Sequence, residues 1–193
     1  FDQRGSGDSE GRPHDYDAIS DDIASAMKEF FIQVPEMKES VILGLCDAAT
    51  AAAFYGYTDT HVTGLVLMNP WVRPSASLPA SAAGAPRAEL EFWRGVGATD
   101  VRFAARQRLR LQAGDPTLSL PERVFKSLSC FDGEVLLILS GNDRIAREFC
   151  GLLDTRSLER CRRVDLEQAN HTFSSSQWRD RIAQESANWI VSW

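Results

Sequence analysis

The sequence predicts a three-layer α/β fold with a mostly parallel sheet. Short apolar runs with β-branched residues alternate with longer amphipathic stretches, which is the pattern of β-α-β units. The expected strands are residues 41–43, 62–68, 135–139 and 163–166. The expected helices include residues 16–34, 48–55, 120–128 and the final segment 178–193. Parallel strands need crossover connections, so helices should cover the sheet.

The composition indicates one folded domain spanning residues 1–193. The chain has 193 residues, of which 44% are hydrophobic and 25% are charged, enough for a genuine core. The formal net charge of −6 argues against a nucleic-acid partner or an anionic membrane surface. We expect a small-molecule or acyl substrate as the partner, and the sequence does not indicate an oligomeric state.

Residues 73–131 are too long for a connection inside a compact α/β unit. The segment begins with an Ala-, Ser- and Pro-rich stretch and then becomes helical. We interpret it as a helical cap, or lid, inserted within the domain. Trp93 and Phe103 are candidates for its apolar underside, with ordinary packing as the alternative for each.

The four cysteines form no C-x-x-C pair, so neither a zinc site nor a disulfide framework is indicated. This usage favours a reducing, cytoplasmic location. No H-E-x-x-H or G-x-G-x-x-G spacing is present, so we expect no metal and no dinucleotide cofactor. His14 and His61 are expected to be solvated. No apolar run reaches the length of about 20 residues that crosses a bilayer.

Residues 43–49, Leu-Gly-Leu-Cys-Asp-Ala-Ala, carry the strongest local pattern. A buried strand ends, Cys46 is presented, and a helix of small residues begins. Gly44 and Ala48 flank Cys46 at i−2 and i+2, where a strained strand-to-helix elbow requires small residues. The helix start should lower the thiol pKa below about 8.5, and the Asp47 N–H should stabilise an oxyanion. A buried structural cysteine is the alternative.

Asp143 and His171 complete a possible catalytic set. Asp143 follows a buried strand, and His171 lies in the loop after the last strand. The chain order is nucleophile, acid, histidine, and each residue comes at the carboxyl end of a strand, where open α/β sheets bind ligands. Taken singly, Asp143 could be a helix N-cap and His171 a surface loop residue. Their joint positions favour a Cys-His-Asp triad.

The chain resembles the α/β-hydrolase superfamily. Residues 1–9 are similar to its D-x-R-G-x-G-x-S loop, and the elbow, acid and histidine follow in the family's order. A cysteine in place of serine is similar to the dienelactone-hydrolase group. Residues 44–49 and 66–73 more closely resemble the exosortase A system-associated hydrolase, type 1, a bacterial family linked to exopolysaccharide production and protein sorting. Ala48 departs from the family's G-x-S-x-G pattern, where a glycine is usual.

The resemblance implies an α/β-hydrolase fold that is N-terminally incomplete. Relative to the family, the chain lacks three strands, a helix and the loop that donates the second oxyanion N–H. Only the Asp47 amide would then serve the oxyanion, so we expect this chain to be poorly active. The strand at residues 41–43 would also have one unpaired edge, which predicts aggregation, pairing through that edge, or an accompanying segment outside residues 1–193.

The activity expected from these residues is hydrolysis of an ester or thioester. Cys46 would form an acyl-cysteine intermediate, His171 would transfer the proton, and Asp143 would orient the histidine. Cys130, Cys150 and Cys161 are expected to be inert. Two alternatives stay open: an acyltransferase of the same mechanism, and a non-catalytic binding module.

Overall fold

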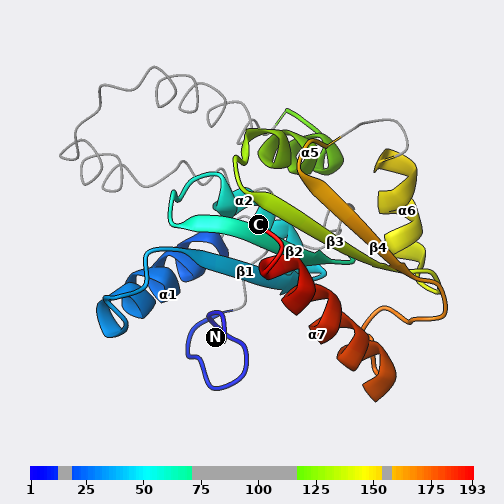
Figure 1. The fold of residues 1–193 in the computed structure, drawn as a ribbon. Coiled ribbons are helices and arrows are strands. Elements are labelled where there is room, and N and C mark those ends of the chain that lie inside the picture. The colour runs from blue at the N-terminus through cyan, green and yellow to red at the C-terminus, as the bar shows by residue number, and fades with distance from the viewer. Residues whose placement is uncertain (13–18, 71–116, 154–157) are drawn as a thin grey trace.

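A parallel sheet forms the centre of the protein. The computed structural model describes residues 1–12, 19–70, 117–153 and 158–193. In these ranges the strands pair in the order β1-β2-β3-β4, and every pairing is parallel (Figure 1). The strands are β1 (Ser40–Leu45), β2 (Val62–Met68), β3 (Glu134–Ser140) and β4 (Cys161–Leu166). All four expected strands are therefore present, each within a few residues of its predicted bounds.

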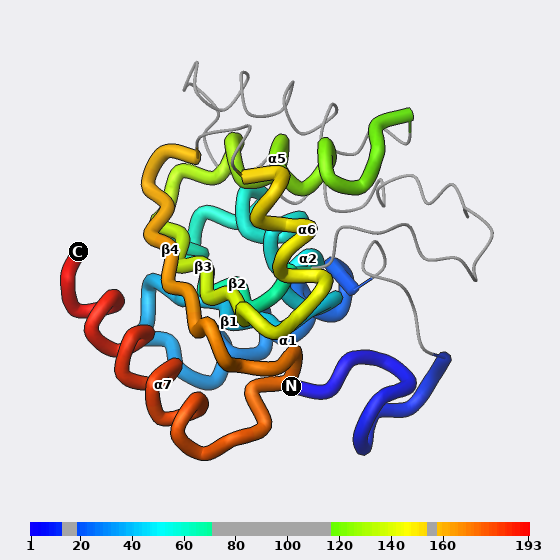
Figure 2. Tube along the Cα trace, turned by 90° about the vertical axis from the view of Figure 1, so that its right-hand side faces the viewer, coloured from blue at the N-terminus to red at the C-terminus, as the bar shows by residue number. Residues whose placement is uncertain are grey.

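Helices cover both faces of this sheet. The described helices are α1 (Ile19–Gln33), α2 (Asp47–Gly56), α5 (Leu120–Cys130), α6 (Arg144–Leu153) and α7 (Ser176–Ile190). Figure 2 shows α7 on one side of the strands and α2, α5 and α6 on the other, and α1 packs against α2. The predicted three-layer α/β fold is confirmed.

The two central strands are apolar on both faces, as expected for strands between two helical layers. Leu65 and Leu67 of β2 belong to the core beneath α2, α5 and α6. Val66 and Met68 alternate with them and face Ile182 and Trp189 of α7. Side-chain alternation along each strand thus divides the hydrophobic core into two layers.

The part of the predicted cap that the structure describes packs into the main body. The start of α5 is fixed by Ser119, whose N–H donates to the Glu122 carboxylate at 2.9 Å. Leu120, Val124 and Leu128 then face the core. Residues 71–116, including the candidate lid residues Trp93 and Phe103, lie outside the described ranges.

Helical periodicity in the sequence places Phe30 on one face of α1 with Ile19 and Ile23, and Ile190 at helical spacing with Ile182 and Trp189 in α7. In the structure Phe30 and Ile190 are 40% and 42% exposed. Only the early residues Ile19 and Ile23 of α1 are buried, because its first turns make the contact with the core. Ile190 is the last residue of α7, where the helix ends. Among the described residues, no helix is both long enough and apolar enough to cross a membrane.

The two edge strands differ in chemistry. The β4 edge carries Arg162, Arg163 and Asp165, and such charges discourage pairing with another chain. The β1 edge has the sequence Ser-Val-Ile-Leu-Gly-Leu, and β2 is its one partner strand in the described part of the chain. The apolar side chain of Leu43 is 55% exposed there. The β1 edge therefore lacks the usual protection against association.

We predict that the 193-residue chain on its own self-associates through the β1 edge and that Leu43→Lys weakens this association. A lysine on an edge strand opposes pairing because its charge would be desolvated. Sedimentation velocity over a concentration series measures the effect. Ile32→Lys is the matched control, because Ile32 is 59% exposed and belongs to helix α1, not to an edge strand. Monodisperse wild-type monomers, or equal effects of both substitutions, would contradict the prediction.

Candidate active site

Cys46 occupies a sharp turn between β1 and α2. Its backbone has φ 57° and ψ −118°, a conformation that is strained for a residue with a side chain. The Cys46 N–H donates to the Met68 carbonyl at 2.9 Å, which ties the turn to the end of β2. The Cys46 carbonyl accepts the N–H groups of Ala49 and Thr50 at 3.1 and 3.2 Å. The turn is therefore fixed from both sides.

Gly44 is required by the tightness of this turn. A Cβ atom at Gly44 would lie 2.6 Å from the Ala48 carbonyl carbon and oxygen and 2.7 Å from the Ala49 nitrogen. Backbone atoms cannot move aside as a flexible side chain would. The Ala48 side chain itself is exposed. Crowding thus demands glycine at i−2 but tolerates alanine at i+2, which accounts for the departure at Ala48.

Asp143 makes the contacts that both of its alternative roles, helix cap and partner of a histidine, require. Its carboxylate accepts the N–H groups of Ile145 and Ala146 at 3.2 Å each, and so caps α6. The same Oδ2 atom is 2.9 Å from His171 Nδ1. Burial raises the pKa of Asp143, but the hydrogen bonds from His171 and the two backbone N–H groups outweigh it and hold the pKa below its ordinary value.

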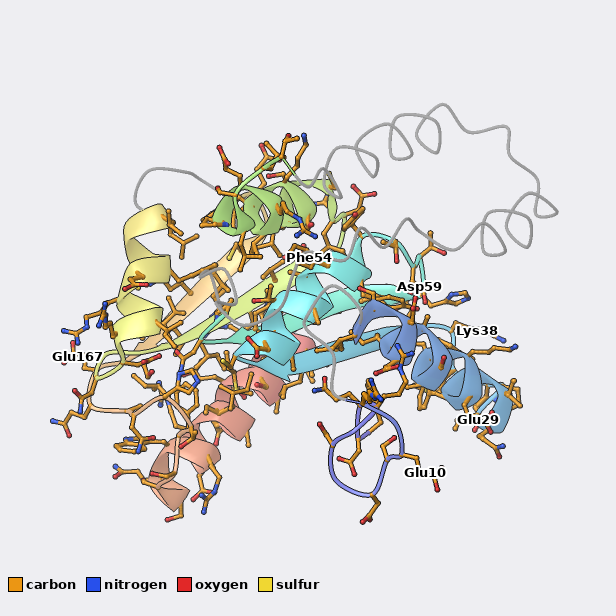
Figure 3. The ribbon with its side chains drawn as sticks, turned by 180° about the vertical axis from the view of Figure 1, so that it is seen from behind. Glu10, Glu29, Lys38, Phe54, Asp59 and Glu167 are labelled. Atoms are coloured by element: carbon orange, nitrogen blue, oxygen red, sulfur yellow. The ribbon has the colours of Figure 1, made fainter. Side chains whose placement is uncertain are left out.

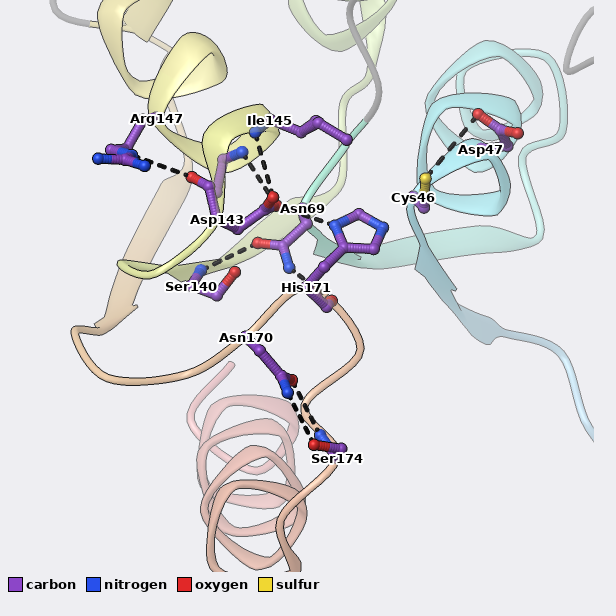
Figure 4. A network of polar contacts seen from close by, with 11 residues as sticks. Cys46, Asp47, Asn69, Ser140, Asp143, Ile145, Arg147, Asn170, His171 and Ser174 are labelled. Carbon is purple, nitrogen blue, oxygen red and sulfur yellow. Dashed lines mark hydrogen bonds and ion pairs between the residues drawn. The ribbon is translucent and has the colours of Figure 1, made fainter.

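His171 lies between the acid and the thiol. Figure 4 shows its ring with Nδ1 turned to Asp143 and the opposite edge turned towards Cys46. Within the described part of the chain, no hydrogen bond joins His171 to the Cys46 sulfur. The structure thus brings the three predicted residues to one edge of the sheet in the order Cys46, His171, Asp143. A hydrogen bond between a nucleophile and its base often forms or tightens only when substrate is bound.

The predicted activation of the thiol is wrong for this structure. The pKa of Cys46 is raised to about 11, first by burial and then by the Asp47 carboxylate, with a smaller contribution from Asp143. The Asp47 backbone N–H stabilises the thiolate, as expected at a helix start, but this effect is smaller. Asp47 Oδ1 lies 4.0 Å from Cys46 Sγ. The resting thiol is therefore protonated at neutral pH.

Asn69, which the sequence analysis did not single out, links the strand ends beneath the site. Its Nδ2 donates to the His171 carbonyl at 2.9 Å, and its Oδ1 accepts the Ser140 N–H at 2.9 Å (Figure 4). The residue is fully buried. A polar residue directly after the apolar strand β2 was the available clue, because buried polar groups need specific partners.

A second histidine–carboxylate pair lies away from this edge. His61 Nδ1 is 2.8 Å from Asp59 Oδ1, and the Tyr55 hydroxyl donates to Asp59 Oδ2 at 2.6 Å. Figure 3 places Asp59 and Glu167 at opposite ends of the molecule. Since Glu167 follows β4, the Asp59 pair belongs to the amino end of the strands and ties α2 to β2. No cluster of three metal-ligating side chains occurs in the described ranges.

Comparison with known proteins identifies the family. Residues 1–185 match the Alpha/beta hydrolase family model. The chain therefore belongs to the alpha/beta hydrolase family. No protein of curated function matches it in sequence.

Solved structures share this fold at low sequence identity. The chain is similar to a monoacylglycerol lipase of Paleococcus ferrophilus (TM-score 0.61, 16% identity), covering 100% of this chain and 82% of that one. It is similar to an esterase of Pyrococcus furiosus (TM-score 0.62, 12% identity), covering 100% and 68%. The esterase domain of a Rhodothermus marinus protein aligns with TM-score 0.55 and 16% identity, covering 88% and 66%. At these identities the likeness establishes the fold.

The close contacts at Gly44 predict that Gly44→Ala destabilises the protein by about 1–3 kcal/mol, the usual cost of forcing an extra group into a packed site. Chemical denaturation measures the change. Gly151→Ala is the matched control, because a Cβ at Gly151 in α6 meets nothing within 4 Å. That control should be neutral or stabilising by up to about 1 kcal/mol. Equal stabilities of the two variants would show that the turn is not crowded.

Because the Asp47 carboxylate raises the pKa of Cys46, we predict that Asp47→Asn makes the thiol more reactive near pH 8. Removing the negative charge favours the thiolate, so the alkylation rate should rise severalfold at fixed pH. Iodoacetamide labelling of Cys46, quantified by peptide mass spectrometry, measures the rate. Glu167→Gln removes the same charge from an exposed residue beyond β4 and should leave the rate unchanged. A slower reaction in Asp47→Asn would refute the assigned cause.

Proposed function

We propose that this protein is an ester or thioester hydrolase that acts through an acyl-cysteine intermediate. The observation that carries the proposal is the bond of 2.9 Å between Asp143 Oδ2 and His171 Nδ1, with the histidine ring turned towards Cys46 at a strained turn. Membership of the alpha/beta hydrolase family supports it. The lipase and esterases named above, which share the fold, agree with this substrate class.

In the acylation step, His171 Nε2 takes the proton of the Cys46 thiol while Sγ attacks the substrate carbonyl carbon. The carbonyl electron pair moves onto oxygen, and the Asp47 N–H at the start of α2 stabilises this oxyanion. Collapse of the tetrahedral intermediate expels the alcohol or thiol, which receives the proton from His171. Asp143 holds the ring orientation and stabilises the imidazolium.

In the deacylation step, His171 removes a proton from water as the water oxygen attacks the thioester carbonyl. The carboxylic acid then leaves and the thiol is restored. Because the pKa of Cys46 is raised to about 11, the thiol carries its proton before the reaction, and His171 has to take that proton for Sγ to attack. The histidine is therefore needed in both steps, as it is for a serine nucleophile.

The physiological setting is a further part of the proposal. Residues 44–49 and 66–73 resemble the exosortase A system-associated hydrolase, type 1, and this supports a role in bacterial exopolysaccharide production and a cytoplasmic location. Deletion of the gene in its bacterium, followed by analysis of exopolysaccharide and of acyl metabolites, tests this role. An unchanged exopolysaccharide would refute the role in exopolysaccharide production and leave the proposed hydrolase chemistry untouched.

We predict that Cys46→Ala in the full-length protein lowers turnover of p-nitrophenyl esters and acyl thioesters by at least about a thousandfold, because no acyl-enzyme can form. Cys46→Ser should keep a small activity, since the same histidine can serve a hydroxyl. The matched control is Cys130→Ala, which removes a buried thiol at the end of α5 and should leave kcat unchanged.

Trapping the intermediate provides the direct readout. Acid quenching during thioester turnover should give a Cys46 peptide carrying the acyl mass. Full turnover in Cys46→Ala would place the nucleophile elsewhere. A folded wild-type protein without turnover of any ester or thioester would favour a non-catalytic binding module.

A further inference from the structure

We propose that Asn69 is a positioning residue that sets the approach of His171 to Cys46. This inference rests on the proposed function for its catalytic readout, but its structural content stands apart from it. The hydrogen bonds of the Asn69 side chain go to main-chain atoms of His171 and Ser140 and not to the thiol or the imidazole ring. It acts through the main chain of His171, whose carbonyl accepts a hydrogen bond of 2.9 Å from Asn69 Nδ2.

Asn69 is itself fixed by hydrogen bonds to β3. Its Oδ1 accepts the N–H of Ser140, the last residue of β3, at 2.9 Å. Its own N–H donates to the Ile138 carbonyl at 3.1 Å, which continues the pairing of β2 with β3. With the side chain fully buried, each of these bonds is shielded from water. Asn69 thus connects the rigid centre of the sheet to the loop that carries the histidine.

Two points fix the orientation of the His171 ring. The Asp143 carboxylate holds Nδ1 at 2.9 Å, and Asn69 holds the backbone carbonyl of the same residue. One contact alone would leave the residue free to pivot about it. The two together determine where the ring edge opposite Nδ1 is directed, and Figure 4 shows that edge facing Cys46.

The end of β2 also fixes the nucleophile. The carbonyl of Met68, the residue before Asn69, accepts the Cys46 N–H at 2.9 Å. Two consecutive residues therefore hold the two proposed reacting groups, one on each side of β2. A displacement of about 1 Å at a reacting group can cost about a hundredfold in rate, so this shared support bears on catalysis.

The identity of the side chain is constrained by three demands. Asn69 has φ 44°, a left-handed conformation that asparagine tolerates better than most residues. The site needs one donor for the His171 carbonyl and one acceptor for the Ser140 N–H. A primary amide of this length supplies both, whereas aspartate supplies acceptors alone.

The test compares Asn69→Asp and Asn69→Gly with wild type. Aspartate keeps the shape but loses the donor, and glycine accepts the positive φ but removes both side-chain bonds. We expect kcat for a p-nitrophenyl ester to fall about 10- to 100-fold with KM changed less than threefold, after normalisation to active sites. Asn170→Ala is the control: it removes the contacts with Ser174 in the same loop, and kcat should stay within twofold.

The NMR chemical shifts of the His171 imidazole ring provide a second measurement, which a purely structural role of Asn69 would leave unchanged. The chain has three histidines, so the His171 resonances can be assigned by difference. At one fixed pH they should shift in both Asn69 variants, while those of His61, at the other end of the sheet, should not. In wild type, the Asn69 side-chain amide protons should exchange slowly with solvent.

The possible outcomes distinguish the positioning role of Asn69 from the proposed hydrolase activity. Folded variants with wild-type kcat and unmoved His171 resonances would overturn the positioning role and leave the hydrolase proposal intact. Equal losses of kcat in Asn170→Ala would also overturn it. A wild-type protein without turnover would refute the hydrolase proposal, and the His171 shift would still decide the role of Asn69. If neither variant folds, fast exchange of the Asn69 amide protons in wild type would reject the bond on which the inference depends.

Discussion

The parallel register of the four described strands is the constraint on which the site depends. Leu45 at the end of β1 pairs with Met68 at the end of β2, and Ser140 at the end of β3 pairs with Leu166 at the end of β4. Because the strands run in one direction, the residues that follow them emerge at one edge. Loop residues far apart in sequence are thus brought together by the main-chain hydrogen bonds of the sheet, without any contact between side chains of the site.

This constraint explains why so much could be predicted from the sequence. The apolar runs of β2 and β3 are long and almost entirely buried, so their positions follow from hydrophobicity, and their parallel direction follows from the helices that alternate with the strands. Once the strand ends are known, Cys46, directly after β1, and Asp143, three residues after β3, fall at the same edge of the sheet. The exposure of Phe30 could not be predicted in this way, because helical periodicity does not show how far along α1 the contact with the core extends.

The electrostatics of the thiol could be predicted only in part. The helix start and the neighbouring Asp47 are both visible in the sequence, and they act on the thiolate in opposite directions. Which one dominates depends on burial and on where the carboxylate points, and Asp47 Oδ1 lies 4.0 Å from Sγ. The outcome is a protonated thiol, so the chemistry depends on proton transfer to His171 more than on a preformed thiolate. That requirement makes the direction of the histidine ring more important than it is beside a stable thiolate.

The need for proton transfer from Cys46 to His171 also explains why a strained backbone at Cys46 is useful. A positive φ at a residue with a side chain persists only when its surroundings determine the conformation, and here the Met68 carbonyl and the first turn of α2 do so. The backbone of the proposed base is held by Asn69, one residue after Met68. The proposed nucleophile and the proposed base are therefore both hydrogen-bonded to the end of β2. Their separation is set by this one element and not by the conformations of two independent loops. A protonated thiol needs a base at a fixed distance, and the end of β2 is the element that can fix it.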